Sequence, residues 1–172
     1  SRRGTFNSNY TDSSAPAVSL QPLRAGSAGT FQTLDAMKRA VLGQISPDFS
    51  GYSDAYNQQA AMAIVGGPWK SKAPALLFSY CRDQIQYINH PWDLQVVKDC
   101  RRTLESGTGD CVSKSVALAT LLACWGIQSR FVVQAPEGQD YSHVYVEANI
   151  DGQWVALDPT ADGRDGRPYA VV

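Results

Sequence analysis

The sequence has few of the residues that build metal centres, disulfide frameworks or nucleic-acid surfaces. It contains two histidines and four cysteines among 172 residues, and no Cys-x-x-Cys pair. Ligands this few and this dispersed argue against a structural zinc site and against a disulfide scaffold. The formal net charge is −1 at pH 7, which argues against a nucleic-acid or anionic-membrane binder because such proteins usually carry a basic stripe.

Long apolar runs and phosphate-binding loops are missing as well. The apolar stretches are far shorter than the roughly 18 residues that indicate a membrane-spanning helix. Gly66-Gly67-Pro68 and the glycines of 163–168 are interpreted as turns, because neither stretch joins a strand to a helix through a Lys-Ser/Thr pair. The sequence therefore predicts no cofactor, no metal, no membrane partner and no nucleic-acid partner. The hydrophobic content of 44% is ample for one core.

The chain divides into a polar leader and one domain. Residues 1–30 are rich in Ser, Thr, Asn, Pro and Gly and are predicted to form an extended or disordered arm. Residues 31–172 are predicted to form a single domain. Apolar spacing and end signals predict four helices, which span 34–42, 53–65, 74–89 and 112–125. The stretch 92–102 is left open between a short helix and extended chain.

The triplet Gly109-Asp110-Cys111 opens the last of these helices. Asp110 is a good N-cap, which places Cys111 at the first helical position. There the helix dipole and the unsatisfied N–H groups favour a thiolate, and the Cys111 backbone N–H can stabilise an oxyanion. Lys114, about one turn further on, is expected to add positive charge. The alternative reading is a buried structural cysteine.

A base and an orienting carboxylate follow on one hairpin. Residues 141–150 alternate as a strand, and Asp151-Gly152 is a two-residue turn signal. Counting outward from that turn pairs Tyr145 with Asp158 and makes Asp158 the diagonal neighbour of His143. Asp158 can therefore orient the imidazole, so the three residues Cys111, His143 and Asp158 suit a nucleophile, a base and an orienter. Taken singly, a strand histidine or an Asp-Pro turn is as often structural as catalytic.

Taken together, these motifs resemble the transglutaminase-like superfamily. The likeness rests on the stretch 103–111 ending in Gly-Thr-Gly-Asp-Cys, on the helix to Trp125-Gly126, and on the strands around His143 and Leu157-Asp158-Pro159-Thr160. It covers about the C-terminal two-fifths of the chain, and small bacterial and phage-encoded members are the most similar. The resemblance implies an α+β fold of the papain and transglutaminase-core kind, with N-terminal helices and with the nucleophile helix packed on a small antiparallel sheet.

The same resemblance implies a cysteine peptidase or amidase that acts through Cys111, His143, Asp158 and a thioester. Two other functions stay open, a transglutaminase-type acyl transferase and a non-enzymatic virion component that retains the fold. The expected partner is a peptide or protein substrate, with an assembly partner for the N-terminal arm as a further expectation. Trp92, Asp110 and Tyr145 are nominated to line the cleft, and Gln95 is a guess for the second oxyanion donor.

The expected location is cytoplasmic or virion-associated. No signal peptide is visible in the sequence, which begins Ser1-Arg2-Arg3 without a methionine. That beginning is what removal of an upstream segment would leave.

Overall fold

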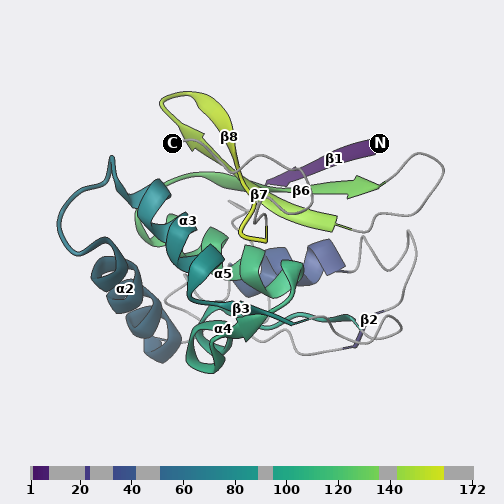
Figure 1. Cartoon of the computed structure of the whole chain (residues 1–172), viewed down its shortest axis with the longest axis horizontal. Helices are drawn as coiled ribbons and strands as arrows, with labels where there is room; N and C mark the ends of the chain where they lie inside the picture. The colour runs from purple at the N-terminus through teal and green to yellow at the C-terminus, as the bar shows by residue number, and fades with distance from the viewer. Residues whose placement is uncertain are drawn as a thin grey trace.

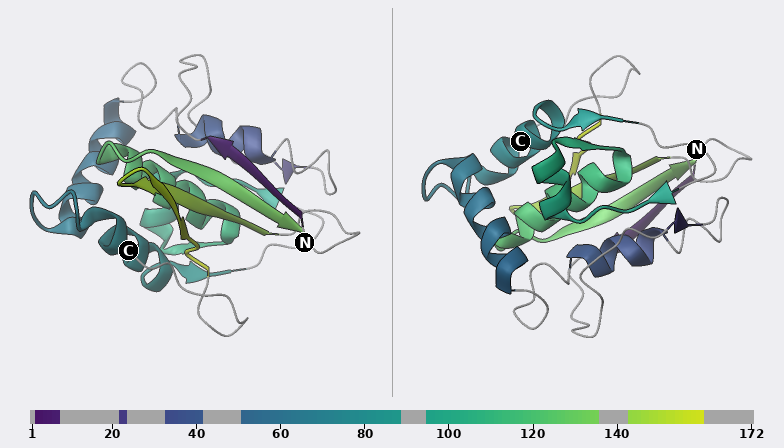
Figure 2. Two further views of the ribbon diagram at one scale, coloured as in Figure 1. Left: turned by 90° about the horizontal axis from the view of Figure 1, so that it is seen from above. Right: turned by 90° about the horizontal axis from the view of Figure 1, so that it is seen from below.

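A sheet on one side and helices on the other make up the protein in the computed structural model (Figure 1). The structure describes residues 2–7, 22–23, 33–41, 51–88, 95–135 and 143–160. Helix α5 lies beneath the sheet, with the remaining labelled helices around it (Figures 1 and 2). The predicted α+β class, with the nucleophile helix packed on a small antiparallel sheet, is confirmed.

The main sheet has four antiparallel strands in the order β1-β6-β7-β8. Their bounds are β1 (Arg2–Asn7), β6 (Ser129–Ala135), β7 (His143–Ile150) and β8 (Gln153–Leu157). Strand β1 pairs with β6 along its whole length, from Arg2 opposite Ala135 to Asn7 opposite Arg130. Part of the segment that the sequence assigned to an N-terminal arm is thus an edge strand of the sheet, a pairing that composition alone does not predict.

The turn between β7 and β8 has the predicted geometry. Asp151 and Gly152 both have positive φ, 54° and 82°, as the two central residues of a type I′ hairpin turn require. Ile150 faces Gln153, and the ladder runs back to Val146 opposite Leu157. The predicted register is therefore confirmed over these five pairs.

Strand β7 is buried on both faces between Val144 and Ala148, although its alternating pattern is typical of a half-buried strand. The inner face carries Val144, Val146 and Ala148 into the core. On the other face Glu147 accepts hydrogen bonds from Arg130, with N–O distances of 2.7 and 2.8 Å, and Arg130 lies 4.1 Å from the Trp154 ring centroid. This ion pair lets a charged residue be buried there.

All four predicted helices are present, and with one exception they agree with the sequence in extent. They span residues 33–41, α2 (Gly51–Val65), α3 (Ala73–Asp83) and α5 (Cys111–Cys124). The undecided stretch 92–102 leads into α4 (Cys100–Ser106), with the two-residue strand β4 (Gln95–Val96) before it. Strand β4 pairs with β2 (Pro22–Leu23) in an antiparallel ladder.

The prediction that the third helix continues to Asn89 was wrong. Helix α3 ends at Asp83, and the chain then forms β3 (Gln86–Tyr87), which pairs in parallel with β5 (Thr108–Gly109). The Lys114 ammonium donates hydrogen bonds to the carbonyls of Arg82 and Ile85, at 3.2 and 2.8 Å. Arg82 is in the last turn of α3, whose carbonyls have no intrahelical donor, and Ile85 lies just after the helix end.

Helix α5 is the centre of the molecule. It contacts α2, α3, α4, β6 and β7, and every residue from Val112 to Leu122 is buried. Its buried polar side chains are satisfied, as buried polar groups normally are. Thr120, for example, donates to the Val116 carbonyl at 2.8 Å. The helix ends where predicted, with Gly126 in the left-handed region at φ 70°.

Within the described residues, no helix has the length and hydropathy to cross a bilayer.

Candidate active site

Cys111 is the first residue of α5, as its sequence context predicts. The Asp110 side chain caps the helix and accepts a 2.9 Å hydrogen bond from the Ser113 N–H. The Cys111 N–H belongs to the first helical turn, where no earlier carbonyl of the helix is available to it. It is therefore suitably placed to donate to an oxygen that lies beside the sulfur.

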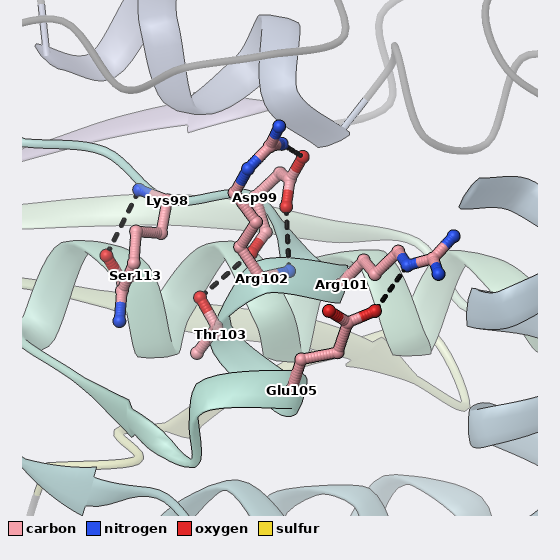
Figure 3. A network of polar contacts seen from close by, with 7 residues as sticks. All are labelled: Lys98, Asp99, Arg101, Arg102, Thr103, Glu105 and Ser113. Carbon is pink, nitrogen blue, oxygen red and sulfur yellow. Dashed lines mark hydrogen bonds and ion pairs between the residues drawn. The ribbon is translucent and has the colours of Figure 1, made fainter.

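The segment that leads into Cys111 is held by a polar network (Figure 3). The Ser113 hydroxyl accepts a 3.2 Å hydrogen bond from the Lys98 N–H, which links the chain before α4 to the first turn of α5. Asp99 caps α4 by accepting from Arg102, with 2.9 Å to the backbone N–H and 2.6 Å to the guanidinium. Thr103 donates to the Asp99 carbonyl at 2.8 Å. These bonds hold the beginning of α4 and join it to the first turn of α5.

Gly109 is closely packed against α4 and α5. A Cβ atom at this position would lie 3.1 Å from Ser113 Cβ and 3.4 Å from both Lys114 Cγ and Thr103 Cγ2. The first of these distances is shorter than ordinary van der Waals contact between carbons. Absence of a side chain at Gly109 lets the chain pass close to α5 immediately before Cys111.

His143 and Asp158 are brought together by the hairpin. His143 Nε2 lies 2.7 Å from Asp158 Oδ2, so the contact that the register predicted is present. The other carboxylate oxygen, Oδ1, accepts two bonds from Thr160, at 3.0 Å from its N–H and 2.7 Å from its hydroxyl. Burial raises the pKa of Asp158, but the hydrogen bonds and charge of His143 and the bonds from Thr160 outweigh it and leave the pKa lowered.

Tyr145 supports the imidazole from the same strand. Its ring stacks on His143 with centroids 5.9 Å apart and an interplanar angle of 26°. Tyr145 and Asp110, both nominated to line the cleft, are buried. In the structure Tyr145 packs on His143 and Asp110 caps α5. Sequence reasoning overlooked Thr160, although a threonine two residues after an aspartate is a recognisable turn pattern.

The effect of the helix terminus, which favours a thiolate at Cys111, is opposed by burial of the sulfur. Burial raises the pKa of the Cys111 thiol to about 12, and the Asp110 and Asp158 carboxylates also raise it. Hydrogen bonding from the backbone of Val144 and Val112 lowers it, without reversing the shift. Desolvation of the sulfur therefore outweighs the helix terminus. The hydrogen bond from the Val144 backbone also places the Cys111 thiol beside the start of β7, because Val144 directly follows His143.

Lys114 does not add charge to the nucleophile in the way that the sequence suggested. Its side chain is 2% exposed, and its ammonium binds the carbonyls at the end of α3. Burial lowers the pKa of Lys114, while Cys81, Asp83 and Asp158 partly oppose that shift. Its contacts make it a link between two helices.

Several predicted features lie outside what the structure describes. Trp92 falls in an undescribed stretch, and of Gln95 only the backbone, in β4, is described. Within the described part of the chain, no group of three His, Cys, Asp or Glu side chains is arranged to hold a metal ion.

The sequence model of the transglutaminase-like superfamily matches residues 58–159, which include Cys111, His143 and Asp158. The chain belongs to this superfamily. This membership confirms the resemblance drawn from the motifs around these three residues, and it reaches further back along the chain, into α2.

Two solved structures are similar in fold to this superfamily member. One, from Parabacteroides distasonis, is described as a "putative protease"; it has 16% sequence identity and a TM-score of 0.53, and the match covers 69% of this chain and 26% of that protein. The other, described as a "putative cysteine protease" from Cytophaga hutchinsonii, has 18% identity and a TM-score of 0.49, with 70% and 42% covered. The matched region is thus less than half of either protein. No curated protein matches the sequence.

Proposed function

We propose that the protein is a cysteine-dependent hydrolase of amide or peptide bonds, with Cys111 as nucleophile, His143 as base and Asp158 as orienter. The observation that carries the proposal is the 2.7 Å contact between His143 Nε2 and Asp158 Oδ2. It commits Nε2 to the carboxylate and makes Nδ1 the ring nitrogen available for the thiol. The Cys111 sulfur lies against the backbone of Val144, the residue directly after His143.

The reaction that these groups support has two halves. The Cys111 sulfur attacks the carbonyl carbon while its proton passes to His143, and the Cys111 N–H donates to the oxyanion. The C–N bond then breaks, and His143 gives the proton to the leaving amine. In the second half His143 takes a proton from water as the water oxygen attacks the thioester carbonyl. The C–S bond then breaks, the carboxylic acid leaves, and His143 returns the proton to the Cys111 sulfur.

Burial raises the pKa of the Cys111 thiol, and a raised pKa favours transfer of the thiol proton to His143 together with the attack on the carbonyl. General-base assistance of this kind contributes about 10²–10⁴-fold to a rate. The site therefore depends on the base more strongly than a preformed thiolate would.

Family membership and the printed descriptions of the two similar structures support this class of reaction. An acyl transferase would use the same three residues, with an amine in place of water in the second half. The proposed hydrolase releases a free acid, and a transferase would release a new amide.

The experiment compares these products directly. The protein is incubated with a mixture of peptides and an excess of a fluorescent primary amine, and the products are read by mass spectrometry. Hydrolysis predicts new carboxyl termini that disappear with Cys111→Ala and decline with His143→Ala. If the main product carries the amine, the protein is an acyl transferase and the proposed hydrolase function is wrong. Products that persist in Cys111→Ala would contradict both.

A further inference from the structure

Lys98 contacts the chain both before and after Cys111. Its backbone N–H donates to the Ser113 hydroxyl at 3.2 Å, two residues after the cysteine (Figure 3). Its ammonium donates to the Thr108 carbonyl at 2.7 Å and to the Thr108 hydroxyl at 3.2 Å, three residues before the cysteine. A further bond, of 3.1 Å, goes to the Ser106 hydroxyl. One residue thus joins the segment that precedes Cys111 to the first turn of α5.

The ammonium of Lys98 is bound by uncharged oxygens and lies near one carboxylate. A lysine side chain has three N–H donors, and the three bonds to residues 106–108 match that number. Burial lowers the pKa of Lys98, while the Asp110 carboxylate opposes that shift. The positive charge of Lys98 therefore acts on the residue immediately before Cys111.

Strand β5, which leads to Cys111, is held along both of its edges. The carbonyls of Gly107 and Gly109 accept hydrogen bonds from the backbone N–H groups of residues 86 and 88. Carbonyls along a strand point to alternate edges, and the carbonyl between these two, that of Thr108, accepts from Lys98. A lysine that served only the end of α4 would be expected to bind the last carbonyls of that helix. The shortest bond of Lys98 lies beyond them, in β5.

We propose that Lys98 is a positioning residue for the reaction at Cys111. By joining β5 to α5, it fixes the peptide group between Asp110 and Cys111, whose N–H donates to the oxyanion in the proposed reaction. Its charge also offsets that of the Asp110 carboxylate, which can then cap α5 with a smaller effect on the thiol. The inference rests on the proposed function and adds a residue that acts through the segment before Cys111 without touching the substrate.

The first test separates kcat from KM on one peptide substrate. Lys98→Met keeps the length of the side chain and removes its donors and its charge. Because the oxyanion contact forms in the transition state, kcat should fall about tenfold while KM changes by less than about twofold. Lys98→Arg keeps the charge and several donors and should recover most of kcat. Lys72 is exposed, and the control Lys72→Met should change neither constant.

The second test requires no turnover and follows the labelling of Cys111 by iodoacetamide between pH 7 and 9. The charged groups that act on this thiol are the carboxylates of Asp110 and Asp158, the second of which contacts His143. Without the lysine charge, the Asp110 carboxylate should raise the pKa of the thiol further, so Lys98→Met should label about threefold more slowly. In an Asp110→Asn protein, the same change should alter the rate by less than about 1.5-fold.

The proposal requires both the selective fall in kcat and the slower labelling. Unchanged or faster labelling in Lys98→Met, or an unchanged kcat, would overturn it and leave Lys98 as a support for α4. Protection of the buried Cys81 and Cys100 from the same reagent shows that each variant is folded. Failure of the proposed function has a different signature, because the original protein would then release no new carboxyl termini and His143→Ala would label as fast as the original.

Discussion

At the scale of single residues, the two oxygens of the Asp158 carboxylate contact different partners. Oδ2 contacts His143 Nε2, and Oδ1 accepts both bonds from Thr160. Thr160 thus fixes the rotation of the carboxylate, and the carboxylate fixes the ring. Groups that orient a base through a hydrogen bond contribute measurably although they do not touch the substrate.

This chain of contacts predicts a graded loss of activity. Asp158→Ala removes the orienter and is expected to lower kcat/KM by about 10⁴-fold. Thr160→Val removes only the hydroxyl bond and keeps the N–H bond, so a loss of about tenfold or less is expected. Steady-state kinetics on one peptide substrate would give both values. Equal losses, or a larger loss for Thr160→Val, would contradict the proposal that Asp158 orients His143 directly and that Thr160 acts only through Asp158.

Asp110 has two opposing effects on the nucleophile. Its side chain caps α5, and its negative charge raises the pKa of the Cys111 thiol. Asp110→Asn keeps an oxygen for the cap, since asparagine caps helices about as well as aspartate, and removes the charge. The thiol pKa should therefore fall, and more thiolate should be present at any pH below it.

The expected result is about threefold faster alkylation of Cys111 by iodoacetamide between pH 7 and 9, with little change in thermal stability. Asp35→Asn, on the exposed face of the helix at 33–41, is the matched control and should leave the rate unchanged. Slower alkylation in Asp110→Asn would show that the charge of Asp110 assists the thiolate instead of opposing it.

Among the elements, the contact between α3 and α5 passes through Lys114. The buried ammonium donates to the carbonyls of Arg82 and Ile85 at the point where α3 ends and the chain turns toward β3. The sequence places a lysine one turn after the cysteine but gives no information on which way its side chain extends. That direction depends on α3, which is distant in sequence.

Lys114→Met should therefore act on stability. It keeps most of the side-chain volume and leaves two carbonyls without their donor, which is expected to lower the free energy of unfolding by about 1–3 kcal/mol. The exposed Lys70 is the control, and Lys70→Met should change stability by less than about 0.5 kcal/mol. Denaturant titration measures both. A Lys114→Met protein as stable as the original would show that these bonds contribute nothing net.

At the scale of the whole molecule, the sheet joins the beginning of the chain to the strands that carry His143 and lead to Asp158. Strand β1 covers the edge of β6, and β6 in turn pairs with β7, which carries His143. An exposed strand edge presents unpaired backbone groups and favours aggregation. The N-terminal residues therefore contribute to the sheet in addition to any contact they make with a partner.

Removal of residues 1–7 is expected to lower the Tm by several degrees, because about 1 kcal/mol corresponds to roughly 2–4 °C for a chain of this size. The shortened protein should also aggregate more readily as its β6 edge becomes accessible. Differential scanning calorimetry and light scattering test the two effects. An unchanged Tm would instead support an arm that is independent of the domain.

The parts of the structure that follow local rules could be predicted from the sequence. The Asp110 cap, the turn at Asp151-Gly152 and the resulting contact between His143 and Asp158 depend on neighbours along the chain or on a short count across a hairpin. The early end of α3, the direction of Lys114 and the raised pKa of Cys111 depend on packing between distant segments. No local pattern encodes those contacts, so the sequence left them undetermined or wrong.

The central claim is that His143 activates Cys111, and the most direct measurement is the rate of alkylation at that residue. The original protein and His143→Ala are treated with iodoacetamide at pH 7, and modification is quantified at each cysteine, with Cys81, Cys100 and Cys124 as internal references. The account predicts labelling of Cys111 at least tenfold faster than in His143→Ala, with the reference cysteines unchanged. Equal rates at Cys111 in the two proteins would contradict it and would favour a structural cysteine in a fold without catalytic activity.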